Sequence, residues 1–308
     1  MTSGDLLRLR IDDTFAEVLG RCPADVAADA VGLPCELGLV RPGENWEHFI
    51  ITDVNRDLPR YAAESGTEPG RSTLSSDSLR AFRRAHHCGI IYGLIVDRIE
   101  DGQRASTPKL RRLRRVFKRA WIDTLTEATG DGAFARRLVV NSLRSLRAGN
   151  TRERQALAIA QMTPGRLTPP EYVRFTLAKL RWFGTSADAL LVRKNEGERH
   201  RAFRRAYDTF SIALQCIDDA LDESSDRETR GASFPSALGF PPGGFLVAAS
   251  GLMSRAGEIA RRAGFTELGR WFGHVANTLA TRPVAGDPLE VGITAQLLCA
   301  AAEEATGA

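Results

Sequence analysis

Apolar residues recur every three or four positions along most of the chain, which is the spacing of one face of an α-helix. From Trp46 onward, for example, Phe49, Ile50 and Val54 follow this interval. No segment alternates apolar and polar residues between hairpin turns, as a half-buried strand would. We therefore predict an all-α fold, built as one large helical bundle with a single domain over residues 1–308.

The helix with the most distinctive pattern begins after Ser75 and ends before Gly102. Ser75 or Ser76 is suited to cap its N-terminus, and Asp77 lies in its first turn. Its middle, from Cys88 to Val96, is apolar on all sides. A helix that is apolar all round is buried, so we expect this one at the centre of the bundle.

Cap signals indicate where several later helices begin or end. Thr107 and Pro108 are suited to be the N-cap and first residue of a helix. The sequence TPPE at 168–171 reads as a capping box with proline at the first helical position. Gly149 predicts the end of a helix that starts at 132. Apart from the helix that begins after Thr168, the helical patterns after residue 130 cover 132–148, 151–162, 197–223, 245–263, 266–280 and 287–305.

Three aspartates lie in the stretch SIALQCIDDALDE, residues 211–223. In a helix Asp218 and Asp222 are four residues apart and Asp219 and Asp222 three apart, so all three are expected on one face, with Gln215 beside them. The rest of the stretch is mostly apolar, and a buried helix carries three carboxylates only with a compensating cation. One interpretation is a divalent-metal site on the inner wall of the bundle. The other is an acidic helix end that runs into solvent.

A second group of carboxylates ends the central helix. Asp97 and Asp101 are four residues apart, and Glu100 lies between them. The helix dipole repels acidic side chains at a C-terminus. A bound cation would remove this conflict, and a fully solvated helix end would also tolerate it. Because two buried helices carry such groups, we expect them to converge on a central active-site cavity, as metals are held between facing helices in other bundles.

Composition and charge narrow the classes of protein. The 42 Lys and Arg residues against 38 Asp and Glu give a net charge of +4, which is too small to indicate nucleic-acid binding. The basic run at 109–119 is interleaved with leucines and has no aromatic pattern for bases, which is typical of a solvated outer helix. The five cysteines form no CxxC pair, so a disulfide scaffold or zinc ribbon is not expected. Without a membrane-spanning apolar run or a signal-peptide pattern, we expect a cytoplasmic protein with no stable membrane insertion.

Three segments resemble the trans-isoprenyl diphosphate synthases and the class I terpene synthases that share their fold. HHCGIIYGLIVDRIEDG (86–102) is similar to the first aspartate-rich region of this family, usually DDxxD. LTPPEYVRFTLAKLRWFGTSADAL (167–190) resembles the family helix with a diphosphate-binding lysine, here Lys179. ALQCIDDALDESSDRETRGASFPSALG (213–239) is similar to the second region, QxxDDxxD followed by a GKxSFP-like loop. The resemblance covers residues 86–240 and implies the isoprenoid-synthase fold.

The sequence departs from the family pattern mainly where the second substrate binds. Arg98 replaces the second aspartate of the first motif, and in place of the RRG that usually follows it the nearest basic residue is Arg104. The GGKRLRP segment that binds isopentenyl diphosphate is not recognisable in residues 30–60. Gly231 and Ala232 stand where the later GK lysine is expected. The motif residues that bind metal and the allylic diphosphate in this family are thus mostly present, whereas those that bind isopentenyl diphosphate are missing.

This pattern favours an Mg²⁺-dependent class I terpene synthase. Such an enzyme ionises an allylic prenyl diphosphate of fifteen or twenty carbons, linear or already cyclised, then cyclises or rearranges the carbocation and releases diphosphate. One alternative is a trans-isoprenyl diphosphate synthase that condenses an allylic diphosphate with isopentenyl diphosphate. Another is a catalytically silent homologue that acts as a partner subunit. The resemblance also allows a homodimer.

The resemblance implies a set of site residues in the segments quoted above. Tyr92 occupies the place where the family sets pocket depth, and Gly89 and Gly93 leave room beside it. The expected catalytic carboxylates are Asp97, Asp101, Asp218, Asp219 and Asp222. All of these except Asp219 are expected to bind Mg²⁺, which prefers oxygen ligands and substrate phosphates. The expected substrate-binding residues are Lys179, Gln215, Arg104, Tyr92 and Phe175.

Overall fold

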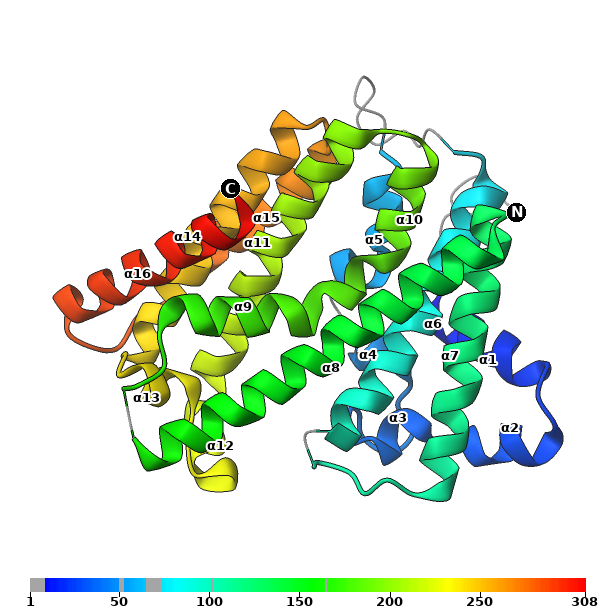
Figure 1. The fold of residues 1–308 in the computed structure, drawn as a ribbon, viewed down its shortest axis with the longest axis horizontal. Coiled ribbons are helices and arrows are strands. Elements are labelled where there is room, and N and C mark those ends of the chain that lie inside the picture. Colours follow the sequence, from blue (N-terminus) through cyan, green and yellow to red (C-terminus); the bar gives the residue numbers. More distant parts are fainter. Residues whose placement is uncertain (1–8, 50–52, 65–73, 101, 164) are drawn as a thin grey trace. The chain divides into compact units, whose positions relative to one another are not determined.

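The computed structural model describes residues 9–49, 53–64, 74–100, 102–163 and 165–308. Within these ranges every regular element is a helix and no strand is present (Figure 1). The predicted all-α fold is therefore confirmed. The chain divides into two compact units. Unit 1 comprises Met1–Glu64, Arg71–Ser142 and Trp182–Glu196, and unit 2 comprises Ser65–Gly70, Leu143–Arg181 and Gly197–Ala308. The single domain over 1–308 stays a prediction.

Unit 1 is organised around the long helix α6, which was predicted as the central one. Residues 88–96 of α6 are all buried, and α6 packs along α7. Thr107 caps α7 by accepting a hydrogen bond from the Leu110 N–H at 3.1 Å, as the sequence indicated. The helices of unit 1 are α1 (Ile11–Gly20), α2 (Ala24–Ala30), α3 (Leu33–Glu36), α4 (Trp46–Phe49), α5 (Asp53–Ala62), α6 (Ser76–Glu100), α7 (Pro108–Thr129) and α10 (Thr185–Arg193).

Two buried histidines of α6 are satisfied by hydrogen bonds in the core of unit 1. His86 Nε2 lies 2.6 Å from the carbonyl oxygen of Asn55, and His87 Nε2 lies 3.1 Å from that of Arg56. His87 Nδ1 is also 2.9 Å from the hydroxyl of Thr14. Burial lowers the pKa of His86 to about 4 and the pKa of His87 well below its usual value. Both histidines are therefore neutral structural groups.

Unit 2 contains the second aspartate-rich segment. Its helices α11, α14 and α15 form the most extensive packing, and α16 covers α14. The helix α8 (Gly132–Met162) begins in unit 1 and continues into unit 2, and the short 3₁₀ helix η1 (Arg181–Gly184) follows α9. The other helices of unit 2 are α9 (Pro169–Leu180), α11 (Gly197–Leu221), α12 (Glu223–Arg230), α13 (Phe234–Leu238), α14 (Pro242–Arg262), α15 (Thr266–Ala280) and α16 (Pro288–Thr306).

The expected break at Gly149 is wrong, because α8 continues through it as one helix. The glycine is there for packing. A Cβ atom at Gly149 would lie 2.7 Å from the Cα atom of Lys179 on α9, which is closer than real Cβ contacts. Its absence lets the two helix backbones approach each other directly.

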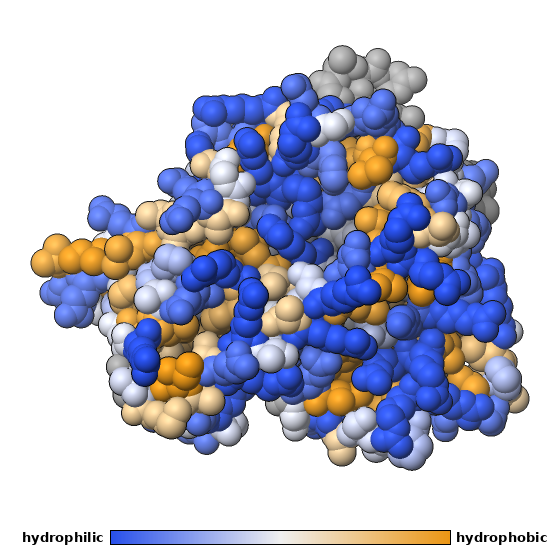
Figure 2. Space-filling model, viewed as in Figure 1, coloured by the Kyte–Doolittle hydropathy of each residue, from blue (hydrophilic) through white to orange (hydrophobic). Residues whose placement is uncertain are grey.

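The outer side of α16 exposes a stripe of large apolar residues four positions apart. The exposed fractions are 71% for Leu289, 48% for Ile293 and 45% for Leu297. Figure 2 shows hydrophobic surface along the projecting end of this helix, at the left of the view. None of the helices in the described part of the chain combines the length and apolar character needed to span a lipid bilayer.

Candidate active site

Asp218 and Asp219 at the end of α11 and Asp222 at the N-cap of α12 point in different directions, unlike the single shared face that their spacing suggested. Asp218 and Asp222 are exposed, whereas Asp219 is buried with an exposed fraction of 4%. The Asp222 N–H donates to the Asp218 carbonyl at 2.9 Å, so the helical turn is complete between these two residues. Consecutive helical residues lie about 100° apart around the helix axis. Of these three aspartates, only Asp219 therefore lies on the buried side of the helix.

Two side chains hold the Asp219 carboxyl group inside unit 2. The Tyr172 hydroxyl donates to Oδ2 at 2.6 Å, and the Gln215 amide donates to Oδ1 at 2.8 Å. Burial raises the pKa of Asp219 to about 8, although both hydrogen bonds lower it. The charges of Asp218 and Glu153 raise this pKa further. Asp219 thus fixes α9 against α11, while Asp218 and Asp222 remain on the surface.

Lys179, the expected diphosphate-binding cation, forms an ion pair inside unit 2. Its Nζ lies 2.9 Å from Oε2 and 3.1 Å from Oε1 of Glu153 on α8. The exposed fractions of the two side chains are only 12% and 7%. Much of the lysine charge is therefore balanced within the protein.

The carboxylates that end α6 belong to unit 1. Asp97 and Glu100 are half-buried, and Asp101 lies outside the described residues. Arg98, which replaces the second aspartate of the motif, donates to the side-chain oxygen of Gln103. Its carbonyl also accepts a hydrogen bond from the Arg104 N–H at 2.9 Å, so the chain folds back immediately after α6.

Arg104 contacts backbone carbonyls of unit 1. Its Nε donates to the Glu36 carbonyl at 2.6 Å and its Nη1 donates to the Gln103 carbonyl at 3.0 Å. Gly38, with a φ of 71°, lies so close that a Cβ atom there would overlap with the guanidinium group. Arg104 thus anchors the segment after α6 to the end of α3.

The space beside Tyr92 is filled by tryptophan rings. Tyr92 is buried, and its ring centroid lies 6.0 Å from that of Trp121. A Cβ atom at Gly89 would lie 2.9 Å from the Trp121 ring, and one at Gly93 would overlap with Trp182. The expectation that these glycines leave room for a substrate is wrong in unit 1, because indole rings occupy that room.

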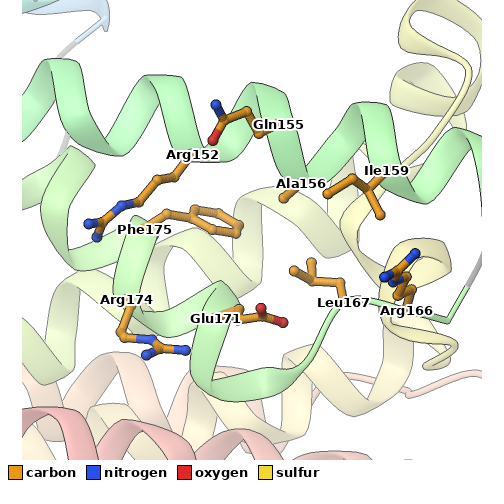
Figure 3. A pocket seen from close by; sticks show the side chains of 9 residues that line it. All are labelled: Arg152, Gln155, Ala156, Ile159, Arg166, Leu167, Glu171, Arg174 and Phe175. Carbon is orange, nitrogen blue, oxygen red and sulfur yellow. The ribbon is translucent and has the colours of Figure 1, made fainter.

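Phe175 is buried in an aromatic cluster of unit 2 and also lines a pocket. Its ring centroid lies 5.6 Å from that of Tyr172 and 5.2 Å from that of Phe234. The pocket has a volume of about 480 Å³ and lies between α8, the connection after it and α9. Figure 3 shows the nine side chains that line it: Arg152, Gln155, Ala156, Ile159, Arg166, Leu167, Glu171, Arg174 and Phe175.

Several residues around these groups were missed by the sequence analysis. Tyr172 lies seven positions before Lys179, so both are on one face of α9, and this spacing was the available signal. Glu153 gave no comparable signal, because its partner lies on another helix. Among the described residues no group of three or more His, Cys, Asp or Glu side chains is gathered closely enough to hold a metal ion.

Comparison with solved structures supports the assignment of the fold. No protein-family model matches the sequence, and no curated protein matches it. Among solved structures, a polyprenyl synthetase from Streptomyces coelicolor A3(2) is similar, with 14% sequence identity over 96% of this chain and 96% of that chain and a TM-score of 0.51. At this identity the likeness shows a shared fold, and it agrees with the isoprenoid-synthase fold that the sequence resemblance implied.

Proposed function

We propose that the protein is a class I terpene synthase that acts on an allylic prenyl diphosphate. The observation that carries this proposal is the end of α11, where Asp218 and Asp222 are exposed one helical turn apart while Asp219 is held by Tyr172 and Gln215. Support also comes from the fold shared with a polyprenyl synthetase. The missing residues of the isopentenyl diphosphate site favour a reaction of one prenyl diphosphate over the condensation of two diphosphates.

The donor set at α11 fits Mg²⁺. Carboxylate oxygens are the ligands that this ion takes, together with substrate phosphates and water. Asp218 and Asp222 of unit 2 would hold it. Asp97 and Asp101 stay predicted Mg²⁺ ligands from the resemblance. Bound Mg²⁺ would neutralise the charge that develops on the leaving diphosphate.

The protein's own residues have three tasks in this mechanism. Asp219 keeps α11 fixed through Tyr172, so that its two neighbours are presented in constant geometry. Gln215, which lies 3.5 Å from Asp218 Oδ2 as well, orients that carboxylate. The ring of Phe175, which belongs to the same unit as Asp218 and Asp222, would stabilise a carbocation by cation–π attraction, contributing about 2 kcal/mol when water is excluded.

Product analysis tests the proposal directly. Purified protein with Mg²⁺ is incubated with farnesyl or geranylgeranyl diphosphate, each with and without isopentenyl diphosphate. A hydrocarbon or terpene alcohol formed from one allylic diphosphate alone is expected. A longer prenyl diphosphate formed only with isopentenyl diphosphate would instead establish the alternative prenyltransferase, which the name of the structural neighbour favours. If no linear substrate gives a product, the substrate is already cyclised or the protein is a silent partner subunit. Assaying already cyclised diphosphates in the same way distinguishes these two interpretations.

Carboxylate variants test the site. Asp218→Ala and Asp222→Ala are expected to abolish product formation while the protein stays folded, because both side chains are exposed. Glu228→Ala is the matched control, since Glu228 is an exposed carboxylate of the adjacent helix α12. Full activity in both aspartate variants would contradict the assignment.

A further inference from the structure

Another pocket of unit 2 lies between the first turns of α11 and the last turns of α14. Its volume of about 670 Å³ is within the usual range for small-molecule sites. Asp219 lies near the other end of α11, so at a rise of about 1.5 Å per residue it is about 30 Å from Arg199 in this pocket. The pocket is therefore separate from the candidate active site. The residues that line it are Glu198, Arg199, Ala202, Arg205, Arg255, Ile259, Arg262, Ala263, Gly307 and Ala308.

The lining residues of the two long helices recur at intervals of three or four positions. Arg255, Ile259 and Arg262 share one face of α14, and Ala202 and Arg205 share one face of α11. Each helix contributes two arginines to the pocket, with a small or branched apolar residue between them in the sequence.

The helices α11 and α14 run antiparallel, as contacts at both of their ends show. Near the start of α11, Arg199 Nε donates to the carbonyl oxygen of Ala263, just after the end of α14, at 3.2 Å. Near the end of α11, Asp219 accepts a hydrogen bond from Tyr172, whose ring centroid lies 5.6 Å from that of Phe245 in the first turns of α14. The first residues of α11 therefore face the last residues of α14.

This arrangement brings the four arginines to two levels along the pocket. Arg199 lies beside the end of α14, where Arg262 is, and Arg205 lies two turns further along α11, near the level of Arg255. The helical rise separates the two levels by about 9 Å on α11 and about 10 Å on α14. The apolar residues of the lining lie between the levels.

Three of these arginines can bind a ligand at little cost. Arg205 is exposed, and within the described residues its side chain makes no hydrogen bond or ion pair. Arg255 Nη1 donates to Glu258 Oε2 at 3.0 Å, and Arg262 donates to the other oxygen of the same carboxylate. The Glu258 side chain is 39% exposed, and exposed ion pairs contribute little to stability. Arg255 and Arg262 can therefore turn from Glu258 towards a ligand.

Arg255 also has a donor that the protein does not satisfy. In the part of the chain that the structure describes, its Nε atom is buried and has no hydrogen-bond partner. Buried N–H groups are rarely left unpaired. An oxyanion bound by Nε and Nη in parallel would satisfy this donor when the side chain turns into the pocket.

The charge of the pocket matches a ligand with two negative charges. Its four guanidinium groups, set against the carboxylates of Glu198 and Glu258, leave a net side-chain charge of +2. One carboxylate at each end of a ligand would balance this charge. Two phosphate monoesters would bring about −3 to −4 at pH 7 and leave the complex negatively charged. A hydrocarbon chain between the two groups would cover Ala202 and Ile259.

We propose that this pocket binds a soluble organic dicarboxylate with a short hydrocarbon chain between its two carboxylates. One carboxylate would bind Arg205 and Arg255, and the other Arg199 and Arg262. Guanidinium groups bind carboxylates with two parallel hydrogen bonds, which gives each end of the ligand directional contacts. The interaction uses no divalent ion and no residue of the aspartate site, so it does not rest on the proposed synthase activity.

Calorimetric titration of the full chain in EDTA tests the proposal. The probes are suberate, whose extended chain spans the two levels, glutarate, which has the same charge on a shorter chain, and octanoate, which has the same number of carbons as suberate but one carboxylate. Suberate is expected to bind at least about tenfold more tightly than either, because it alone reaches both pairs of arginines. Equal affinity for glutarate or octanoate, or no binding of suberate, would overturn the proposal.

Arginine variants identify the residues involved. Arg205→Gln and Arg255→Gln are each expected to weaken suberate binding about tenfold by removing a charge-assisted donor pair. Arg201→Gln is the matched control, because Arg201 is an exposed arginine of α11 that does not line the pocket. An equal loss in Arg201→Gln would mean that only the general charge of the surface matters and would overturn the assignment.

Glu258→Gln is expected to strengthen suberate binding about twofold to fivefold, because it removes the carboxylate that competes for Arg255 and Arg262. Glu290→Gln, at an exposed carboxylate in the first turn of α16, is the control with the same change of charge. An equal gain in both variants would contradict a ligand bound at these two arginines.

A bisphosphate of similar length tests the kind of oxyanion. Hexanediol bisphosphate carries more charge than the pocket balances, so it is expected to bind no more tightly than suberate. Tighter binding of the bisphosphate, lost in Arg205→Gln, would overturn the assignment to a dicarboxylate.

Discussion

The indole ring of Trp182 lies directly against Gly93 of α6, at the place that the Cβ atom of any other residue would occupy. Both residues belong to unit 1, and Trp182 is buried with an exposed fraction of 4%. Its ring centroid is 6.4 Å from that of Trp121, which fills the neighbouring space over Gly89. The two glycines of α6 thus serve helix-to-ring packing.

Gly93→Ala is expected to destabilise the protein by about 1–3 kcal/mol, because an added methyl group in a packed core forces its neighbours to shift. Chemical denaturation monitored by circular dichroism measures this change. Gly251→Ala is the matched control, since a Cβ atom at this exposed position of α14 meets only Cys299 Sγ, at 3.5 Å. The control should be neutral or gain about 0.5–1 kcal/mol from the higher helix propensity of alanine. If Gly93→Ala were as stable as the wild type, the close packing of Trp182 would be wrong.

The sequence predicted elements whose signals are local and missed features that depend on a partner element. The bounds of α6, the Thr107 cap and the capping box at Thr168 follow from apolar spacing and cap chemistry within a few residues. A helix end was wrongly predicted at Gly149. A glycine is needed there because the backbone at Lys179, on another helix, packs against this position.

The same limit applies to the candidate site. Asp218, Asp219 and Asp222 could be recognised from their spacing, yet the inward direction of Asp219 depends on Tyr172 of α9. The balance of charge at Lys179 depends likewise on Glu153 of α8. Neither partner can be identified from one sequence, because it is brought close only by the packing of helices.

Tyr172→Phe is expected to destabilise unit 2 by about 1–3 kcal/mol, because it removes a donor from the buried Asp219 carboxyl group. Asp219→Leu should also destabilise, since it leaves the Tyr172 hydroxyl buried without this acceptor. The double variant should recover much of the loss, as replacing both partners leaves neither group unsatisfied. Denaturation of the four proteins forms a double-mutant cycle. Additive losses would show that the two side chains do not interact.

Acidification is expected to destabilise unit 1 through His86 and His87. Their pKa values are lowered in the folded protein, to about 4 for His86, so the unfolded chain binds more protons once the pH falls below the ordinary histidine pKa of 6.5. The stabilising contribution of neutral His86 is thus complete above pH 6.5 and is lost towards pH 4, by about 1.4 kcal/mol for each pH unit between these values.

His86→Gln isolates this effect, because glutamine can still donate to the Asn55 carbonyl but does not titrate. The free energy of unfolding of this variant should fall less between pH 7 and pH 5 than that of the wild type. His274→Gln, at an exposed histidine of α15, is the control. The same pH dependence in His86→Gln and wild type would contradict a buried neutral His86.

Lys179 and Glu153 provide a test that separates a structural role from substrate binding. Lys179→Met leaves the Glu153 carboxylate buried without this cation, so the free energy of unfolding is expected to fall by about 3 kcal/mol. Lys179→Met/Glu153→Leu should recover most of this loss, because neither charge then remains in the core. If Lys179 also binds the diphosphate, the stable double variant will show a raised KM for the prenyl diphosphate. If the lysine is purely structural, the double variant will keep the wild-type KM, and the cation for the diphosphate must be sought among other residues. A Lys179→Met variant with unchanged stability would contradict the buried ion pair itself.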